Sequence, residues 1–160
     1  MASITRGIME SIQRTLSAHA FFATSPQIPV LIEDSKAIEA EIGNAMKMTG
    51  AFVMIIDSGG ENDSPNIPSP TMSEYEFTLR VSEIPSVWRG KPGPTPAASE
   101  IAEATARIIH QKIPTDTAGT RLGNGPILFQ SKQPVENESF LQYDITVSMM
   151  IVLSNESPTR

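Results

Sequence analysis

Cysteine is absent from the 160 residues of the chain. A disulfide framework, a thiolate nucleophile and any zinc site that needs sulfur ligands are therefore excluded. Long hydrophobic runs are absent too, because no stretch approaches the roughly 20 apolar residues that span a bilayer. The opening stretch "MASITRGIMESIQRTL" is amphipathic, so we do not expect it to act as a secretory signal.

Positive charge is scarce and scattered. Lys and Arg number 12 against 18 Asp and Glu, which gives a formal net charge of -6. Affinity for DNA comes mainly from neutralising phosphates, so an acidic domain without a basic cluster is a poor candidate for wrapping DNA. We therefore expect no sequence-specific binding of nucleic acid.

What the chain does contain is enough apolar residues for a core. Hydrophobic residues make up 39% of it and charged residues 19%, which is the composition of a folded soluble protein. A length of 160 residues matches one domain. We expect a single α+β domain over residues 1–160.

Helical periodicity predicts three helices, at 3–17, from 34 or 35 to 50, and at 95–111. The first carries an apolar residue at every fourth position, namely Ile4, Ile8, Ile12 and Leu16. Gly50 is the residue type that commonly ends a helix. The third helix is expected to start with Thr95 as its cap and Pro96 at its first position.

The sequence patterns of several segments between and after these helices predict β-strands. "AFVMIID" at 51–57 is apolar on both faces, and "YEFTLRVSE" at 75–83 alternates strictly. "VLIED" reads as a short extended piece, and residues 127–153 read as two strands joined by a turn. These elements predict a mixed or antiparallel sheet of about four main strands with helices packed on one face.

Two segments are expected to be long loops, at 58–71 and 113–125, because they are rich in Gly, Pro, Ser and Asn. A long loop in a compact domain is usually functional or disordered. We expect residues 155–160 to form a flexible tail.

Residue types that carry out catalysis do not form a recognisable set in the sequence. His19 and His110 fall at helix ends, with no nucleophile or orienting carboxylate near them in the sequence. "DSGGEND" at 57–63 lacks the ligand spacing of a calcium loop, and "RLGNGP" at 121–126 lacks a phosphate-binding pattern. We expect no catalytic residue, metal or cofactor, and therefore an interaction protein rather than an enzyme.

Three segments carry a resemblance to a known family. They are "IPVLIEDSKAIEAEIGNAMKMTGAFVMIID" at 28–57, "FTLRVSEIPSVWRG" at 77–90 and "PAASEIAEATARIIH" at 96–110. In order and character they resemble the tail terminator, or tail-completion, proteins of tailed bacteriophages and prophages, in the group that includes minor tail proteins. The three segments cover a little more than a third of the chain. Each motif alone is of low specificity.

The resemblance implies a structural virion protein of the tail and neck, assembled in the cytoplasm of the host bacterium. It implies a hexameric ring that caps the tail tube, stops its polymerisation and joins it to the head-side connector, with DNA passing through the ring at most. Two alternatives stay open. One is another neck or head–tail joining protein, and the other is a small host enzyme or ligand-binding protein.

The family often has a V-x-E-N-P-x-x-N-R-like turn after a strand. Val81, Glu83, Pro85 and Arg89 match it, whereas Ile84 and Trp88 stand where asparagines are expected. Trp and Arg are favoured at the centres of interfaces, but Trp88 could equally cover its own domain as a core anchor. The residues predicted to contact other subunits, tube or neck are Arg80, Glu83, Pro85, Trp88, Arg89 and Arg121.

Overall fold

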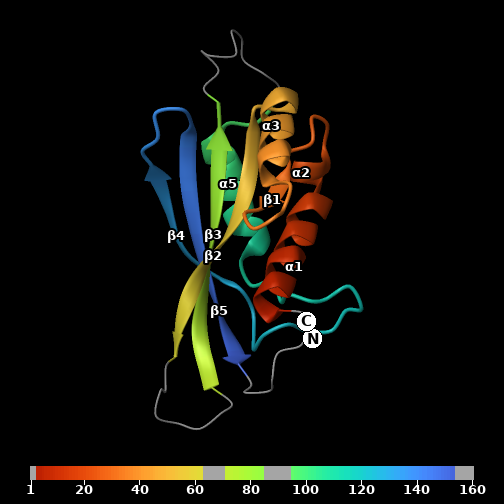
Figure 1. The fold of residues 1–160 in the computed structure, drawn as a ribbon, viewed down its shortest axis with the longest axis vertical. Coiled ribbons are helices and arrows are strands. Elements are labelled where there is room, and N and C mark those ends of the chain that lie inside the picture. Colours follow the sequence, from red (N-terminus) through yellow and green to blue (C-terminus); the bar gives the residue numbers. More distant parts are fainter. Residues whose placement is uncertain (1–2, 63–70, 85–94, 154–160) are drawn as a thin grey trace.

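The computed structural model describes residues 3–62, 71–84 and 95–153. The elements follow the order α1 (Ile4–Ala18), α2 (Ala20–Ala23), β1 (Val30–Ile32), α3 (Ile38–Met48), β2 (Ala51–Asn62), β3 (Thr71–Glu83), α5 (Ala98–Ile109), β4 (Leu128–Val135) and β5 (Leu141–Leu153). Within these residues one five-stranded sheet has the strand order β1-β2-β3-β5-β4 (Figure 1). β1 runs parallel to β2 and the other pairs are antiparallel. The α+β class and the mixed sheet are therefore confirmed.

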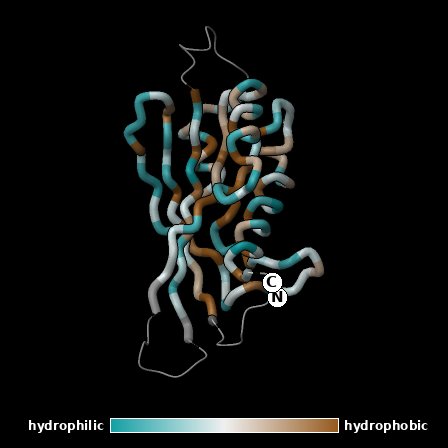
Figure 2. Tube along the Cα trace, viewed as in Figure 1, coloured by the Kyte–Doolittle hydropathy of each residue, from teal (hydrophilic) through white to brown (hydrophobic). Residues whose placement is uncertain are grey.

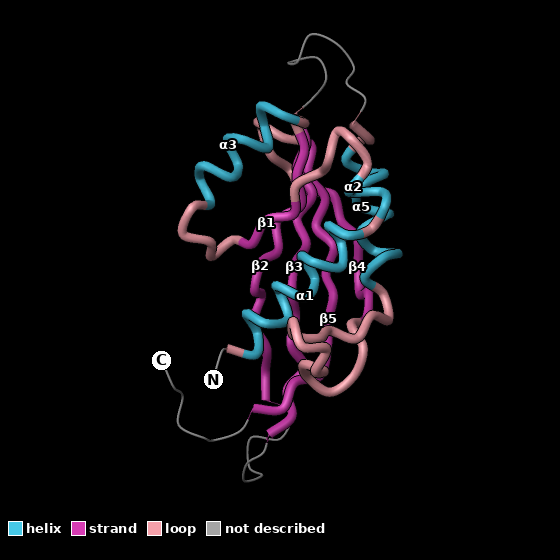
Figure 3. Tube along the Cα trace, turned by 90° about the vertical axis from the view of Figure 1, so that its right-hand side faces the viewer, coloured by secondary structure: helices cyan, strands magenta, loops and turns pink. Residues whose placement is uncertain are grey.

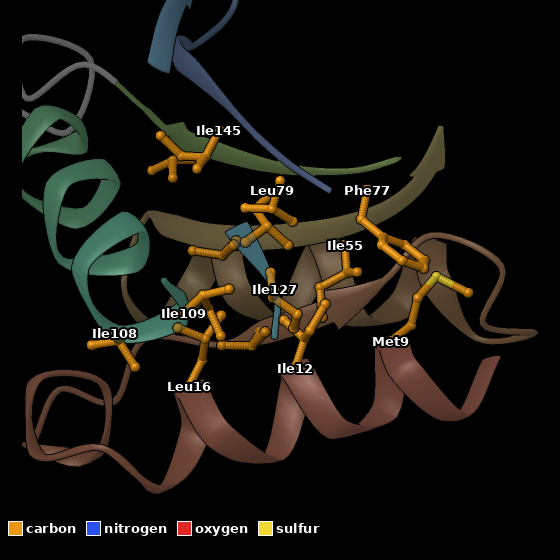
Figure 4. Packing of buried hydrophobic residues seen from close by; sticks show 14 of the residues in the cluster. Met9, Ile12, Leu16, Ile55, Phe77, Leu79, Ile108, Ile109, Ile127 and Ile145 are labelled. Atoms are coloured by element: carbon orange, nitrogen blue, oxygen red, sulfur yellow. The ribbon is translucent and has the colours of Figure 1, made fainter. Parts of the chain in front are cut away.

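The main core lies between the sheet and the helices α1, α2 and α5. Met9, Ile12 and Leu16 project from α1 toward the sheet, and none is more than 3% exposed (Figure 4). The sheet residues that meet this layer and are labelled in Figure 4 are Ile55, Phe77, Leu79 and Ile145. Burying one such side chain stabilises the fold by about 1.5–3 kcal/mol. The side of α1 that packs on the sheet is the side predicted from the apolar spacing.

Helix α3 packs on the opposite face of the sheet, at the β1–β2 edge. Successive strand residues point to opposite faces, and Leu31 and Phe52 alternate with the residues of the main core. These two form a second small cluster with Ala45 of α3. The expectation of helices on one face holds for α1, α2 and α5 but not for α3, which stands apart from them in Figure 3. This placement explains why "AFVMIID" is apolar on both faces.

Helix boundaries differ from the predicted ones where tertiary contacts intervene. Thr95 does not cap α5, because its hydroxyl donates to the Thr49 carbonyl oxygen at 3.1 Å, and the helix begins at Ala98 instead. Helix α3 begins at Ile38, after a turn in which the Ile38 N–H donates to the Ser35 carbonyl. The stop at Gly50 is confirmed, with φ at 71°. The four-residue helix α2 was not predicted.

Part of the segment predicted as a loop over 58–71 is strand instead. Residues 58–62 continue β2, and residue 71 already belongs to β3. The pairing of these residues across the hairpin outweighs their turn-like composition. Residues 63–70 and the predicted tail at 155–160 lie outside the described residues.

The segment 113–125 is a long loop, as predicted. Its only β pairing is one isolated bridge between Thr115 and Arg121. It is anchored on α1, because the Ser11 hydroxyl accepts the Thr115 N–H at 3.0 Å. The Asp116 carboxylate in turn accepts the N–H groups of Ala118 and Thr120 at 2.9 Å.

None of the described helices combines the length and the apolar character needed to cross a bilayer.

Candidate functional site

The predicted contact residue Glu83 lies in a groove at one end of the sheet. It is the last residue of β3, is 6% exposed and pairs in register with Leu141 of β5. The groove has a volume of about 650 Å³ and runs between the start of α5 and the β4–β5 hairpin. Besides Glu83, its walls include Ala97 and Ala98 on one side and Phe140 and Leu141 on the other. We call this the end groove.

The start of α5 forms one wall of the end groove and presents small residues. Ala97 and Ala98 have no side chain that could close the groove, and no side chain caps the helix at Ala97. The Glu100 carboxylate instead accepts the Ala97 N–H at 2.9 Å, which satisfies one of the free donors at this end. The wall is therefore shaped by backbone and methyl groups, as suits an apolar contact.

The β4–β5 hairpin forms the other wall and ends in a fixed turn at residues 136–141, which we call the hairpin tip. The Asn137 side-chain oxygen accepts the N–H groups of Ser139 and Phe140, at 2.8 and 3.1 Å. Glu136 and Glu138 are exposed beside it, and Leu141 is 50% exposed. The tip thus presents two carboxylates next to an uncovered apolar side chain.

Arg80 lies on the opposite face of β3 from Glu83, on the side that also carries α3. Its guanidinium donates two hydrogen bonds to the Asp144 carboxylate, from Nε at 2.8 Å and from Nη2 at 2.9 Å. The hydrogen bond with Asp144 raises the pKa of Arg80 above its ordinary value. Its charge is therefore already paired within the chain, although 38% of the side chain is exposed.

Other polar side chains near Arg80 also pair across strands. The Gln142 amide donates to the Ser82 hydroxyl at 2.9 Å, and the Ser58 and Thr78 hydroxyls lie 2.6 Å apart. Such cross-strand pairs stabilise a sheet by a fraction of a kcal/mol to about 1 kcal/mol each. We call the side of β3, β5 and β4 that carries Thr78, Arg80, Ser82, Gln142 and Asp144 the open face; none of the described helices packs on it. Ser58 lies next to it on β2. Figure 2 shows hydrophilic residues along much of β4 at its edge.

Arg121 lies far from Glu83. Its loop reaches the sheet where the Asn124 N–H donates to the Met150 carbonyl, and Met150 pairs with Glu74 of β3. From Glu74 to Glu83 is nine residues, or about 30 Å along a strand. The predicted contact residues are thus spread over two faces and both ends of the sheet. Pro85, Trp88 and Arg89 lie outside the described residues.

Each histidine follows a helix and accepts a hydrogen bond from a backbone N–H, in α2 for His19 and in β4 for His110. The Nδ1 of His19 accepts the Phe21 N–H at 3.1 Å, and the Nδ1 of His110 accepts the Phe129 N–H at 3.1 Å. Within residues 3–62, 71–84 and 95–153, no group of three or more His, Asp or Glu side chains is placed to hold a metal ion.

Asp57, which the sequence places in "DSGGEND", belongs to β2 rather than to a ligand loop. Its carboxylate accepts the Tyr75 hydroxyl at 2.8 Å and the Gly59 N–H at 2.9 Å. Burial raises the pKa of Tyr75 to about 12, and the hydrogen bond and negative charge of Asp57 add to this.

The hairpin tip was not predicted as a contact surface. Its signal was the acidic stretch "ENESF" immediately before the alternating strand, which reads simply as a polar turn. Only the fold brings this turn beside the start of α5 to make the end groove.

No family model matches the chain, and no curated protein matches it either. Solved structures do. A chain from the virion of a native gene transfer agent particle superposes with a TM-score of 0.62 at 12% identity, covering 95% of this chain and 99% of that one. A second solved chain, which carries no functional description, gives a TM-score of 0.53 at 12% identity over 96% and 98% of the two chains. At this identity the likeness shows a shared fold.

Proposed function

We propose that the chain is a structural protein of a phage-like virion, and more specifically the tail terminator. The observation that carries the proposal is the fold shared with a chain of a gene transfer agent virion over 95% of this chain and 99% of that one. The superposition therefore spans nearly all of both chains and is not limited to a shared fragment.

The segments that resemble the tail terminator family support the narrower role. Glu83 of the family-like turn lies in the end groove, which combines apolar side chains with the polar and acidic residues of the exposed hairpin tip. Surfaces of this kind suit contacts between proteins. In the proposed role the chain forms a closed hexameric ring on the tail tube, stops tube growth and meets the head-side connector, without catalysis.

In a ring of this kind, one surface of each copy contacts a different surface of the next copy. Such head-to-tail contacts give a closed ring when the rotation between successive copies adds up to a full turn, and an open filament when it does not. Trp88 and Arg89 stay proposed contact residues for this role, together with Arg80, Glu83, Pro85 and Arg121.

The test is the growth of the tail tube in the presence and absence of this chain. Tube protein from the same genome, polymerised alone, should form tubes of unlimited length. Adding the chain should stop growth and leave a ring-shaped density at one end of each tube in electron micrographs. Tubes that grow to the same length with a tenfold excess of the chain, and that carry no end density, would overturn the terminator role. Binding to the connector without binding to tube ends would instead favour another neck protein.

A further inference from the structure

A second groove lies on the helical side of the molecule, between the end of α1 and the later half of α5. It has a volume of about 710 Å³. Phe21, Ala104 and Ile108 supply its apolar floor. Ile108 belongs to the main core, and Phe21 and Ala104 pack against that core. The groove is therefore a depression in the helical layer with a fixed apolar base.

The rim of this groove carries positive charge. Arg107 and Lys112 supply this charge, in a chain with a net charge of -6. His19 also lines the groove, and its Nδ1 accepts the Phe21 N–H. Arg107 binds Glu103 of its own helix at 2.7 Å, with 80% of the Arg107 side chain exposed, so this pair is weak and can rearrange. Lys112 makes no ion pair with any residue in the described part of the chain. We call this site the basic groove.

The hairpin tip has the complementary properties. It projects, its turn is fixed by Asn137, and it carries Glu136 and Glu138 beside the half-exposed Leu141. Neither carboxylate is ion-paired within the described residues. The tip and the basic groove share no residue. In Figure 1 the β4–β5 turn lies on the left of the view, and α1 and α2 lie on the right.

We infer that the hairpin tip of one copy docks in the basic groove of a neighbouring copy, with Leu141 on the apolar floor and the two glutamates against Arg107 and Lys112. This inference rests on the proposed self-assembly and assigns the surfaces that carry it. The contact joins two different surfaces, so it is heterologous and generates a ring when it closes. Opposite charges at the rim set the orientation and speed the encounter of the copies.

Charge reversal tests the pairing. Arg107→Glu with Lys112→Glu changes the groove, and Glu136→Lys with Glu138→Lys changes the tip. Each pair should weaken self-association at least about a hundredfold, because like charges then face each other across the contact. The chain with all four changes should regain association, because the charges are complementary again. Lys47→Glu and Glu39→Lys on α3 are matched controls, and they should assemble like the wild type.

The absence of native cysteine allows a direct second test. Ser139→Cys at the tip and Thr15→Cys at the groove are made in separate chains, mixed in the assembled state and oxidised. A disulfide between one chain of each kind is expected, with little between identical chains. Lys47→Cys in place of Thr15→Cys should give no such product.

Sedimentation of the full-length chain separates the outcomes. If the wild type assembles and all charge variants assemble equally well without the mixed disulfide, the docking is wrong while the ring stands. If the wild type stays monomeric with and without tail tube, the proposed ring itself fails. Urea midpoints of the variants, expected within about 0.5 kcal/mol of the wild type for exposed positions, exclude unfolding as the cause.

Discussion

The two faces of β3 and β5 differ in how their side chains are accommodated, by apolar burial on one face and by polar pairing on the other. On the helical side, Phe77, Leu79 and Ile145 are completely buried under α1 and α5. On the open face, Arg80 and Asp144 pair with each other and stay partly exposed. The same strands therefore hold the domain together with one set of alternate residues, whereas the other set is largely polar and includes the buried Ser82 and Ser148. Changes on the two faces should consequently have different effects on folding.

The largest expected difference is between neighbouring residues on the two faces. Phe77→Ala should lower the free energy of unfolding by about 3–5 kcal/mol, because it leaves a cavity in a close-packed core. Thr78→Ala should cost about 1 kcal/mol or less, since it removes one exposed hydroxyl pair with Ser58. Urea unfolding followed by circular dichroism measures both. Equal losses at the two positions would contradict the assignment of the faces.

A smaller effect is expected for the ion pair of the open face. A double-mutant cycle with Arg80→Ala and Asp144→Ala should give a coupling energy of about 0.5–1 kcal/mol, because the pair is bidentate but partly exposed. The cycle is measured by urea unfolding at low and at high salt, and the coupling should shrink at high salt. A coupling of zero at low salt would mean that Arg80 is not held by Asp144 in solution.

The smallest effect concerns Tyr75, whose pKa is raised from 10.0 to about 12. A pKa raised on folding means that its stabilising contribution is fully present below pH 10 and is lost as the pH rises from there through about 12. The difference between the wild-type and Tyr75→Phe tyrosinate absorbance titrations isolates this group. Its midpoint should lie well above that of free tyrosine, and a midpoint near the ordinary value would show that the hydroxyl does not bind Asp57.

Local sequence patterns correctly predicted those elements that bury the same side along their whole length. The apolar residue at every fourth position of α1 and the alternation in β3 and β5 are such cases. There the spacing of apolar residues in the sequence identifies the buried side of the element. The side of the sheet taken by α3 was not predictable in the same way. "AFVMIID" showed that both faces of β2 are covered, but not by which helix.

The remaining differences come from contacts distant in sequence. Residues 58–60 have turn-forming character, yet pairing with β3 makes them strand. Thr95 has the side chain of a helix cap, but the Thr49 carbonyl takes its hydroxyl. The end groove and the basic groove each combine segments that are far apart along the chain. Neither groove could be found until those segments were placed in space.

The proposed function requires this chain to assemble into a closed ring on a tail tube. A native mass spectrum of the full-length chain, recorded alone and with its tail tube protein, tests this most directly. The account predicts a single dominant assembly of uniform size, a hexamer, in the presence of tube. A spectrum that shows only the monomer under both conditions, or a symmetric dimer as the end state, would contradict it.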